Sequence, residues 1–148
     1  MSKLTCLVFA AVAVVFSNVN ADDDETRASF RQVLGPLVME CRNEFGITED
    51  DLKKAQQERS PDALKPCFIA CVFKKFGIIT SAGKYDSDAS ISRIKDVVKN
   101  DDLFAKLKSV GEKCNSVNDA SVSDGDAGCE RAALLAKCFI ENKSELSI

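Results

Sequence analysis

The chain has 148 residues, a formal net charge of −3 and no histidine. Its length favours a single domain, and its mild acidity argues against nucleic acid or an anionic membrane surface as a partner. The lack of histidine excludes Ser-His and Cys-His nucleophile pairs and any zinc site that mixes thiolate with imidazole. We therefore expect no catalytic residues and no cofactor.

Residues 1–21 have the pattern of a secretory signal peptide. Lys3 precedes an apolar stretch that ends at Phe16, and the segment closes on the small residue Ala21 ahead of a run of acidic residues. The apolar stretch is shorter than the roughly 20 residues that a membrane-spanning helix needs. We predict cleavage after Ala21, a secreted, extracellular protein with no membrane span, and one folded domain over residues 22–148.

Helical periodicity runs through most of the remaining chain, and strand patterns are nearly absent. Apolar residues at spacings of three and four predict an all-α fold of six helices. These are expected from Thr26 to Phe45, Thr48 to Glu58, Ser60 to Gly77, Asp86 or Asp88 to Val98, Asn100 to Cys114, and from the end of a loop over Asn118 to Gly128 to about residue 140. Pro36 should kink or split the first of them, because proline cannot donate the internal hydrogen bond.

Six cysteines remain once Cys6 is removed with the predicted leader. They are Cys41, Cys67, Cys71, Cys114, Cys129 and Cys138. An oxidising compartment favours disulfides over free thiols. A four-thiolate zinc site would need two close pairs, and only Cys67 and Cys71 are close, so we expect no metal.

Helix geometry excludes some of the fifteen possible cysteine pairings. Cys67 and Cys71 share a helix face with Cβ atoms about 5–6 Å apart, which exceeds the separation that a disulfide allows. Cys129 and Cys138 lie on opposite sides of their helix. These two exclusions leave ten pairings, and we expect Cys67 and Cys71 to join their helix to two different elements.

Three disulfides would stabilise the domain by about 2–4 kcal/mol each, although a domain of this size seldom needs them to form a core. An internal cavity of about 300 Å³ would cost about 7 kcal/mol. Because the two quantities are similar, the cross-links would permit a hollow core.

The cysteine register resembles that of the insect odorant-binding proteins, in the six-cysteine pheromone and general odorant-binding family. The resemblance rests on the three residues between Cys67 and Cys71, the eight between Cys129 and Cys138, and the turn at Gly83-Lys84-Tyr85-Asp86. It covers the whole predicted mature chain. The 14 residues between Cys114 and Cys129 exceed the interval in a typical member, which predicts an extended loop before the last helix.

The resemblance implies a compact six-helix domain around an apolar cavity, cross-linked by three interlocked disulfides: Cys41–Cys71, Cys67–Cys129 and Cys114–Cys138. It also implies a carrier that transports odorants, pheromone-like or fatty-acid-like molecules through sensillar lymph or another extracellular fluid. The implied partners are a small hydrophobic ligand and a membrane odorant receptor. We expect a monomer or a weak homodimer.

Candidate ligand-binding residues are the apolar side chains on the inward helix faces. For each of them ordinary core packing is the alternative role. The set is Leu34, Val38, Ile69, Phe73, Phe76, Ile79, Ile94, Val98, Leu107, Val110, Leu135, Phe139 and Leu146. The last of these lies in a C-terminal tail that would either cover the pocket as a lid or fray.

Two other functions stay open at this point. One is a secreted interaction protein of saliva, venom or seminal fluid that uses the same fold without a cavity. The other is a lipid or hormone carrier outside the olfactory organs, which would share the binding mechanism.

Overall fold

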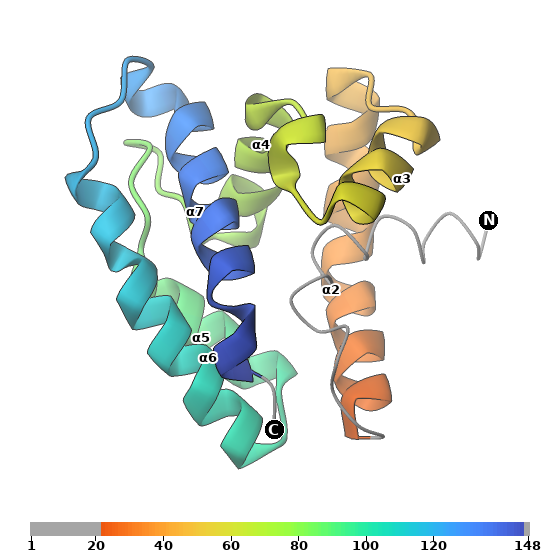
Figure 1. The fold of residues 1–148 in the computed structure, drawn as a ribbon, viewed down its shortest axis with the longest axis vertical. Helices are drawn as coiled ribbons and strands as arrows, with labels where there is room; N and C mark the ends of the chain where they lie inside the picture. Colours follow the sequence, from red (N-terminus) through yellow and green to blue (C-terminus); the bar gives the residue numbers. More distant parts are fainter. Residues whose placement is uncertain (1–21, 147–148) are drawn as a thin grey trace.

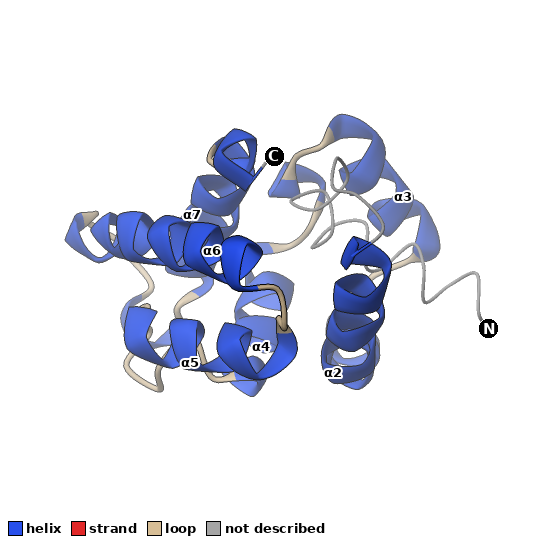
Figure 2. Ribbon diagram, turned by 90° about the horizontal axis from the view of Figure 1, so that it is seen from below, coloured by secondary structure: helices blue, strands red, loops and turns tan. Residues whose placement is uncertain are grey.

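The computed structural model describes residues 22–146, so the predicted leader lies outside the described residues. Within them the chain forms six α-helices and no strand apart from an isolated bridge between Ile79 and Tyr85 (Figures 1 and 2). The helices are α2 (Asp22–Phe45), α3 (Glu49–Glu58), α4 (Pro66–Phe76), α5 (Ser87–Val97), α6 (Asp101–Lys113) and α7 (Cys129–Glu141), with 3-10 turns η2 (Pro61–Ala63), η3 (Cys114–Asp119), η4 (Gly125–Ala127) and η5 (Lys143–Leu146). The predicted all-α six-helix fold is confirmed.

Side-chain caps fix where helices begin. Thr48 and Asp51 form a capping box ahead of α3: Thr48 Oγ1 accepts from the Asp51 N–H at 3.1 Å, and Asp51 Oδ2 accepts from the Thr48 N–H at 2.9 Å. Asp86 Oδ1 accepts from the Ala89 N–H at 2.9 Å and caps α5. The cap of α5 is therefore Asp86 and not Asp88.

The first helix is not split at Pro36, as one form of the prediction required. It starts at the acidic residues before Thr26 and continues without a break to Phe45. Proline removes one internal hydrogen bond, but the helix is held on both sides of that position. Leu34 and Val38, two residues before and two residues after the proline, are both buried, and Cys41 is joined to α4 by a disulfide.

The third predicted helix begins later than expected. Ser60 caps only the 3-10 turn η2, with its Oγ accepting from the Asp62 N–H at 3.2 Å. Leu64 and Lys65 then adopt extended backbone, and α4 starts at Pro66. The cause is Pro66 itself, because the residue before a proline is disfavoured in the helical region while proline fits the first helical position.

Helix α4 lies between α2 and α7, and α5 packs against α6 (Figure 1). Three disulfides fix this arrangement: Cys41–Cys71 joins α2 to α4, Cys67–Cys129 joins α4 to α7, and Cys114–Cys138 joins the end of α6 to α7, with Cα atoms 5.9, 4.4 and 5.9 Å apart. These are the pairs that the family resemblance implies. They interlock because α4 and α7 each carry two of the three bonds.

The apolar core consists of two clusters. One combines the C-terminal half of α2 with α3 and α4, and the other combines the N-terminal half of α2 with α5, α6, α7 and Leu146. Phe73 of α4 packs against both. The space between the clusters is where a cavity can form.

The segment between α6 and α7, predicted as a loop, contains the 3-10 turns η3 and η4. It packs against the turn at Gly83, whose φ is 74°. A Cβ atom on Gly83 would lie 2.3 Å from the carbonyl oxygen of Gly125, so only glycine permits this approach.

Arg131 ties these two segments to α7. It is only 3% exposed, and its guanidinium donates hydrogen bonds to the carbonyl oxygens of Gly83, Val117 and Ala120, at 3.4 Å for Gly83 and 2.9 Å for Ala120. Hydrogen bonds from a charged donor are stronger than neutral ones. Removal of the guanidinium would leave buried carbonyls without a donor.

We predict that Arg131→Met lowers the free energy of unfolding by about 3 kcal/mol, since a buried charged donor and its three bonds are lost. Chemical denaturation with intact disulfides measures the change. The control is Lys137→Met on the same helix, whose ammonium is exposed and lies 4.0 Å from Glu141, and which should change stability by less than about 0.5 kcal/mol. Equal stabilities of the two variants would contradict a structural role for Arg131.

Candidate ligand-binding pocket

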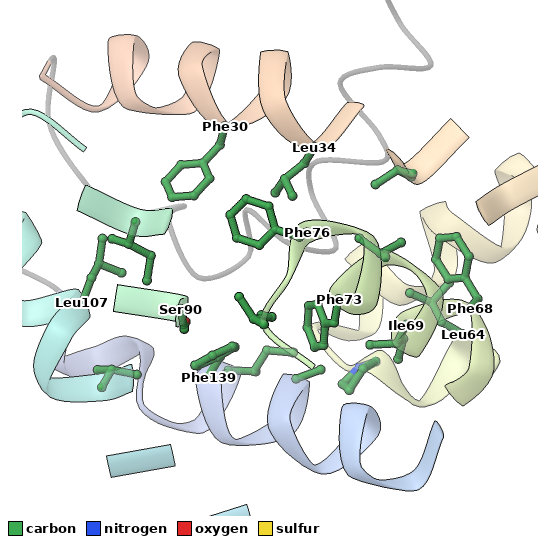
Figure 3. A pocket seen from close by; sticks show the side chains of 18 of the residues that line it. Phe30, Leu34, Leu64, Phe68, Ile69, Phe73, Phe76, Ser90, Leu107 and Phe139 are labelled. Atoms are coloured by element: carbon green, nitrogen blue, oxygen red, sulfur yellow. The ribbon is translucent and has the colours of Figure 1, made fainter. Parts of the chain in front are cut away.

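An apolar pocket of about 140 Å³ is lined by members of both core clusters (Figure 3). Helices α2, α3 and α4 contribute to its wall together with α5, α6, α7 and the tail turn η5. The disulfides Cys41–Cys71 and Cys67–Cys129 fix the spacing of three of these elements. The pocket is therefore built into the cross-linked frame of the domain.

Most of the predicted pocket residues come together in this wall. Ten of the thirteen line it: Leu34, Val38, Ile69, Phe73, Phe76, Ile94, Leu107, Val110, Phe139 and Leu146. They come from α2, α4, α5, α6, α7 and η5. The inward faces of these elements therefore border the same space.

Three predicted residues, Ile79, Val98 and Leu135, do not line this pocket and lie buried in the core. Ile79 pairs with Tyr85 in the isolated bridge, and Val98 forms the C-terminal cap of α5. Leu135 on α7 has no exposed surface and packs within one cluster. Helical periodicity identifies inward faces but does not separate a filled part of a core from a hollow one.

The prediction also missed ten lining residues. They are Phe30, Leu52, Pro61, Leu64, Phe68, Val72, Ile78, Ser90, Ala136 and Ile140. Helical spacing could have predicted some of them. Phe30 lies four residues before Leu34, and Ser90 lies four residues before Ile94, so each shares a helix face with a predicted residue. Pro61 and Leu64 lie in or after a 3-10 turn, where no such period applies.

Aromatic contacts support one side of the wall. The ring of Phe139 meets Phe73 edge to face at 6.5 Å between centroids, and it meets Tyr85 in the same manner at 6.2 Å. Such pairs contribute about 0.5–1.5 kcal/mol beyond the area that they bury. Phe139 thus links α4 to the buried tyrosine across the edge of the pocket.

The C-terminal tail forms part of the pocket wall. Leu146 has no exposed surface, and η5 packs against α6 and α7. Glu145 forms an ion pair with Lys113 of α6 on the outside of this turn. The two alternatives for the tail were a lid over the pocket and a frayed end. The tail is not frayed as far as Leu146.

The pocket is smaller than the 300 Å³ considered from the sequence. At about 140 Å³ its penalty is about 3 kcal/mol. A cavity of about 150 Å³ lined by leucine, isoleucine and phenylalanine stays dry and binds benzene. The present pocket has the same kind of lining, so it is suited to a compact apolar molecule.

Tyr85 is the sole tyrosine of a chain without tryptophan. It is 3% exposed, and its hydroxyl donates to the carbonyl oxygen of Gly111 at 3.1 Å. Burial raises the pKa of Tyr85 above its ordinary value of 10.0, because the charged phenolate loses solvation; a hydrogen bond with Ser90 opposes this in part.

We predict that Tyr85 ionises above pH 10 in the folded protein, as measured by the near-ultraviolet absorbance of tyrosinate. The unfolded chain releases this proton at a lower pH than the folded chain. The stability linked to Tyr85 is therefore complete below pH 10 and is lost as pH rises through the folded pKa. Tyr85→Phe should remove this component of the alkaline loss. Ionisation at or below pH 10 would contradict the burial of the phenol.

Metal-ligating side chains do not gather in groups of three or more anywhere in residues 22–146. Over the same residues, no helix combines the length and the apolar character needed to cross a bilayer. All residues that line the pocket are uncharged.

Comparison with known proteins decides the family. Residues 23–142 match the PBP/GOBP family. The chain belongs to this family of insect odorant-binding proteins. General odorant-binding protein 28a of Drosophila melanogaster is 36% identical over 102 residues, which cover 67% of each chain. The B1 protein of Tenebrio molitor is 24% identical over 113 residues, covering 76% of this chain and 79% of that protein.

A solved structure has the same fold as this chain. Odorant-binding protein dmelOBP28a from Drosophila melanogaster superposes with a TM-score of 0.58 at 25% sequence identity, over 78% of this chain and 95% of that chain. The odorant-binding family consists of carriers of small hydrophobic molecules and not of enzymes, so the predicted absence of catalysis follows from membership.

Proposed function

We propose that this protein is a secreted carrier that binds a small hydrophobic ligand in the pocket between its two core clusters. The observation that carries the proposal is the lining, which is apolar at every position except Ser90. Apolar surface buried on binding contributes about 25 cal/mol per Å². An apolar ligand would move from water into a site that offers few hydrogen bonds. A carrier of such ligands through an aqueous fluid needs a site of this kind.

Secretion belongs to the same proposal. Residues 1–21 would act as the leader and residues 22–148 as the odorant-binding domain, with the protein released into sensillar lymph or another extracellular fluid. The three disulfides support an oxidising compartment. In this proposal the carrier works as a monomer or weak homodimer and delivers its ligand to a membrane odorant receptor.

The size of the pocket favours compact ligands over long-chain ones. A volume of about 140 Å³ accommodates a molecule near the size of benzene without movement of the walls. Odorants or pheromone-like molecules of this size are better candidates than long fatty acids. The pocket also counts against a cavity-free interaction protein of the same fold.

The test of the carrier function is displacement of an environment-sensitive fluorescent probe by a panel of volatiles and fatty acids. We expect displacement by compact apolar volatiles and weaker displacement by long-chain acids. Failure of every apolar compound to bind would contradict the proposal. The tissue in which the protein is expressed then separates an olfactory carrier from one in other organs.

A pocket-filling variant makes the location of the site testable. Ala136 on α7 lines the pocket, and Ala136→Phe should reduce probe affinity at least about 10-fold, because the ring occupies the space that the ligand needs. The matched control is Ala133→Phe, one turn earlier on the same helix and outside the lining. Both are compared by the same fluorescence titration after circular dichroism has verified their helix content. Equal affinities of the two variants would place the ligand elsewhere.

A further inference from the structure

Phe73 is the one partly buried apolar side chain that packs against both core clusters in the described part of the chain. It lies on α4 and also lines the pocket. Figure 3 shows its ring between Leu107 on one side of the pocket and Leu64 on the other. Phe73 therefore lies at the boundary between the two sides of the pocket.

The two sides of the pocket are built by different clusters. On one side the wall includes Leu34 of α2 and Leu107 of α6, and on the other it includes Leu52 of α3 and Leu64 after η2. Both sides belong to one pocket of about 140 Å³, a volume close to that of a cavity that holds one benzene molecule. Because this small volume is shared between two sides, the passage beside the ring of Phe73 is narrow.

Contacts on two sides hold the ring of Phe73 at this boundary. Phe139 of α7 meets it edge to face, with 6.5 Å between centroids and 74° between planes, and Phe139 meets Tyr85 in the same manner at 6.2 Å. The backbone is fixed as well, since Cys71, two residues earlier on α4, is joined to α2 by a disulfide. The ring cannot turn aside without losing its contact with Phe139.

We propose that Phe73 is a specificity-determining residue whose ring sets the upper limit on ligand length, so that the protein selects apolar chains of about six carbons, the size of benzene. A longer chain would have to pass the ring to reach the other side of the pocket. The inference rests on the proposed carrier function and adds the size class of the ligand and the residue that determines it.

The test measures how affinity depends on chain length, with 1-butanol, 1-hexanol, 1-octanol and 1-decanol as probes. Dissociation constants come from NMR titration of the methyl resonances of Leu64 and Leu107, which lie on opposite sides of the ring. Each methylene that finds apolar space should tighten binding about 4-fold. In the unmodified protein we expect this increase to stop near 1-hexanol, so that 1-decanol binds no more tightly than 1-hexanol.

Phe73→Ala removes the ring from the boundary. A phenyl ring has the size of benzene, so its loss about doubles the available volume. The affinity for 1-decanol relative to 1-hexanol should then rise about 10-fold or more, and bound 1-decanol should shift the methyl resonances of both Leu64 and Leu107. Phe73→Leu is the milder variant and should change the preference in the same direction by about 3-fold. It decides the test if circular dichroism shows that Phe73→Ala does not fold.

Two control variants separate the position of Phe73 from the loss of a ring. Phe104→Ala removes a partly buried ring of α6 that packs against one cluster but does not line the pocket, so the preference should stay within about 2-fold. Phe68→Leu makes the same change as Phe73→Leu at a lining residue that packs within one cluster. It should shift the preference less, and an equal or larger shift would refute the role of Phe73.

The outcomes also separate this inference from the carrier function. If none of the alcohols binds the unmodified protein, the carrier function fails and the inference fails with it. If they bind but affinity continues to rise through 1-decanol, or if the folded Phe73 variants keep the preference of the unmodified protein, the carrier function stands and the role of Phe73 is refuted.

Discussion

Helix α4 carries Cys67 and Cys71 one turn apart, and the two cysteines bond to helices on opposite sides of it. This fixes α4 between α2 and α7, and α4 contributes five residues to the pocket wall: Phe68, Ile69, Val72, Phe73 and Phe76. At loop separations of 30 and 62 residues, the two disulfides stabilise the domain by about 4 kcal/mol each. That exceeds the penalty of about 3 kcal/mol for the cavity. The cross-links can therefore maintain a space that packing would otherwise tend to close.

The position of α4, fixed by its two disulfides, also explains the chemistry of the site. Two separate apolar clusters meet around the space, so its wall is made of core side chains and carries no charge. The wall therefore offers an apolar surface and a single side-chain hydroxyl, that of Ser90. The tail completes the wall through Leu146, which connects the end of the chain to the site.

The sequence predicted the parts of the fold that depend on local chemistry. The cap at Thr48 and the stop at Gly77 follow from neighbouring residues alone. The predicted start of the third helix at Ser60 was wrong. Pro66 disfavours helical backbone at the residue before it, and this effect outweighed the cap at Ser60. Pocket residues were predicted where an inward helix face meets the space. Leu135 shows the limit, because its face is equally apolar but faces a filled region.

The central claim is that the disulfides of α4 hold the pocket open. The most direct test is the double variant Cys41→Ala, Cys71→Ala, which frees α2 from α4 while α4 stays tied to α7. Affinity for an apolar fluorescent probe is measured under conditions in which circular dichroism shows the variant to be folded. We predict a loss of affinity of about 10-fold or more, because α2 is then free to shift relative to α4 and the pocket wall loses its fixed spacing. A folded variant that binds the probe as tightly as the unmodified protein would contradict the account.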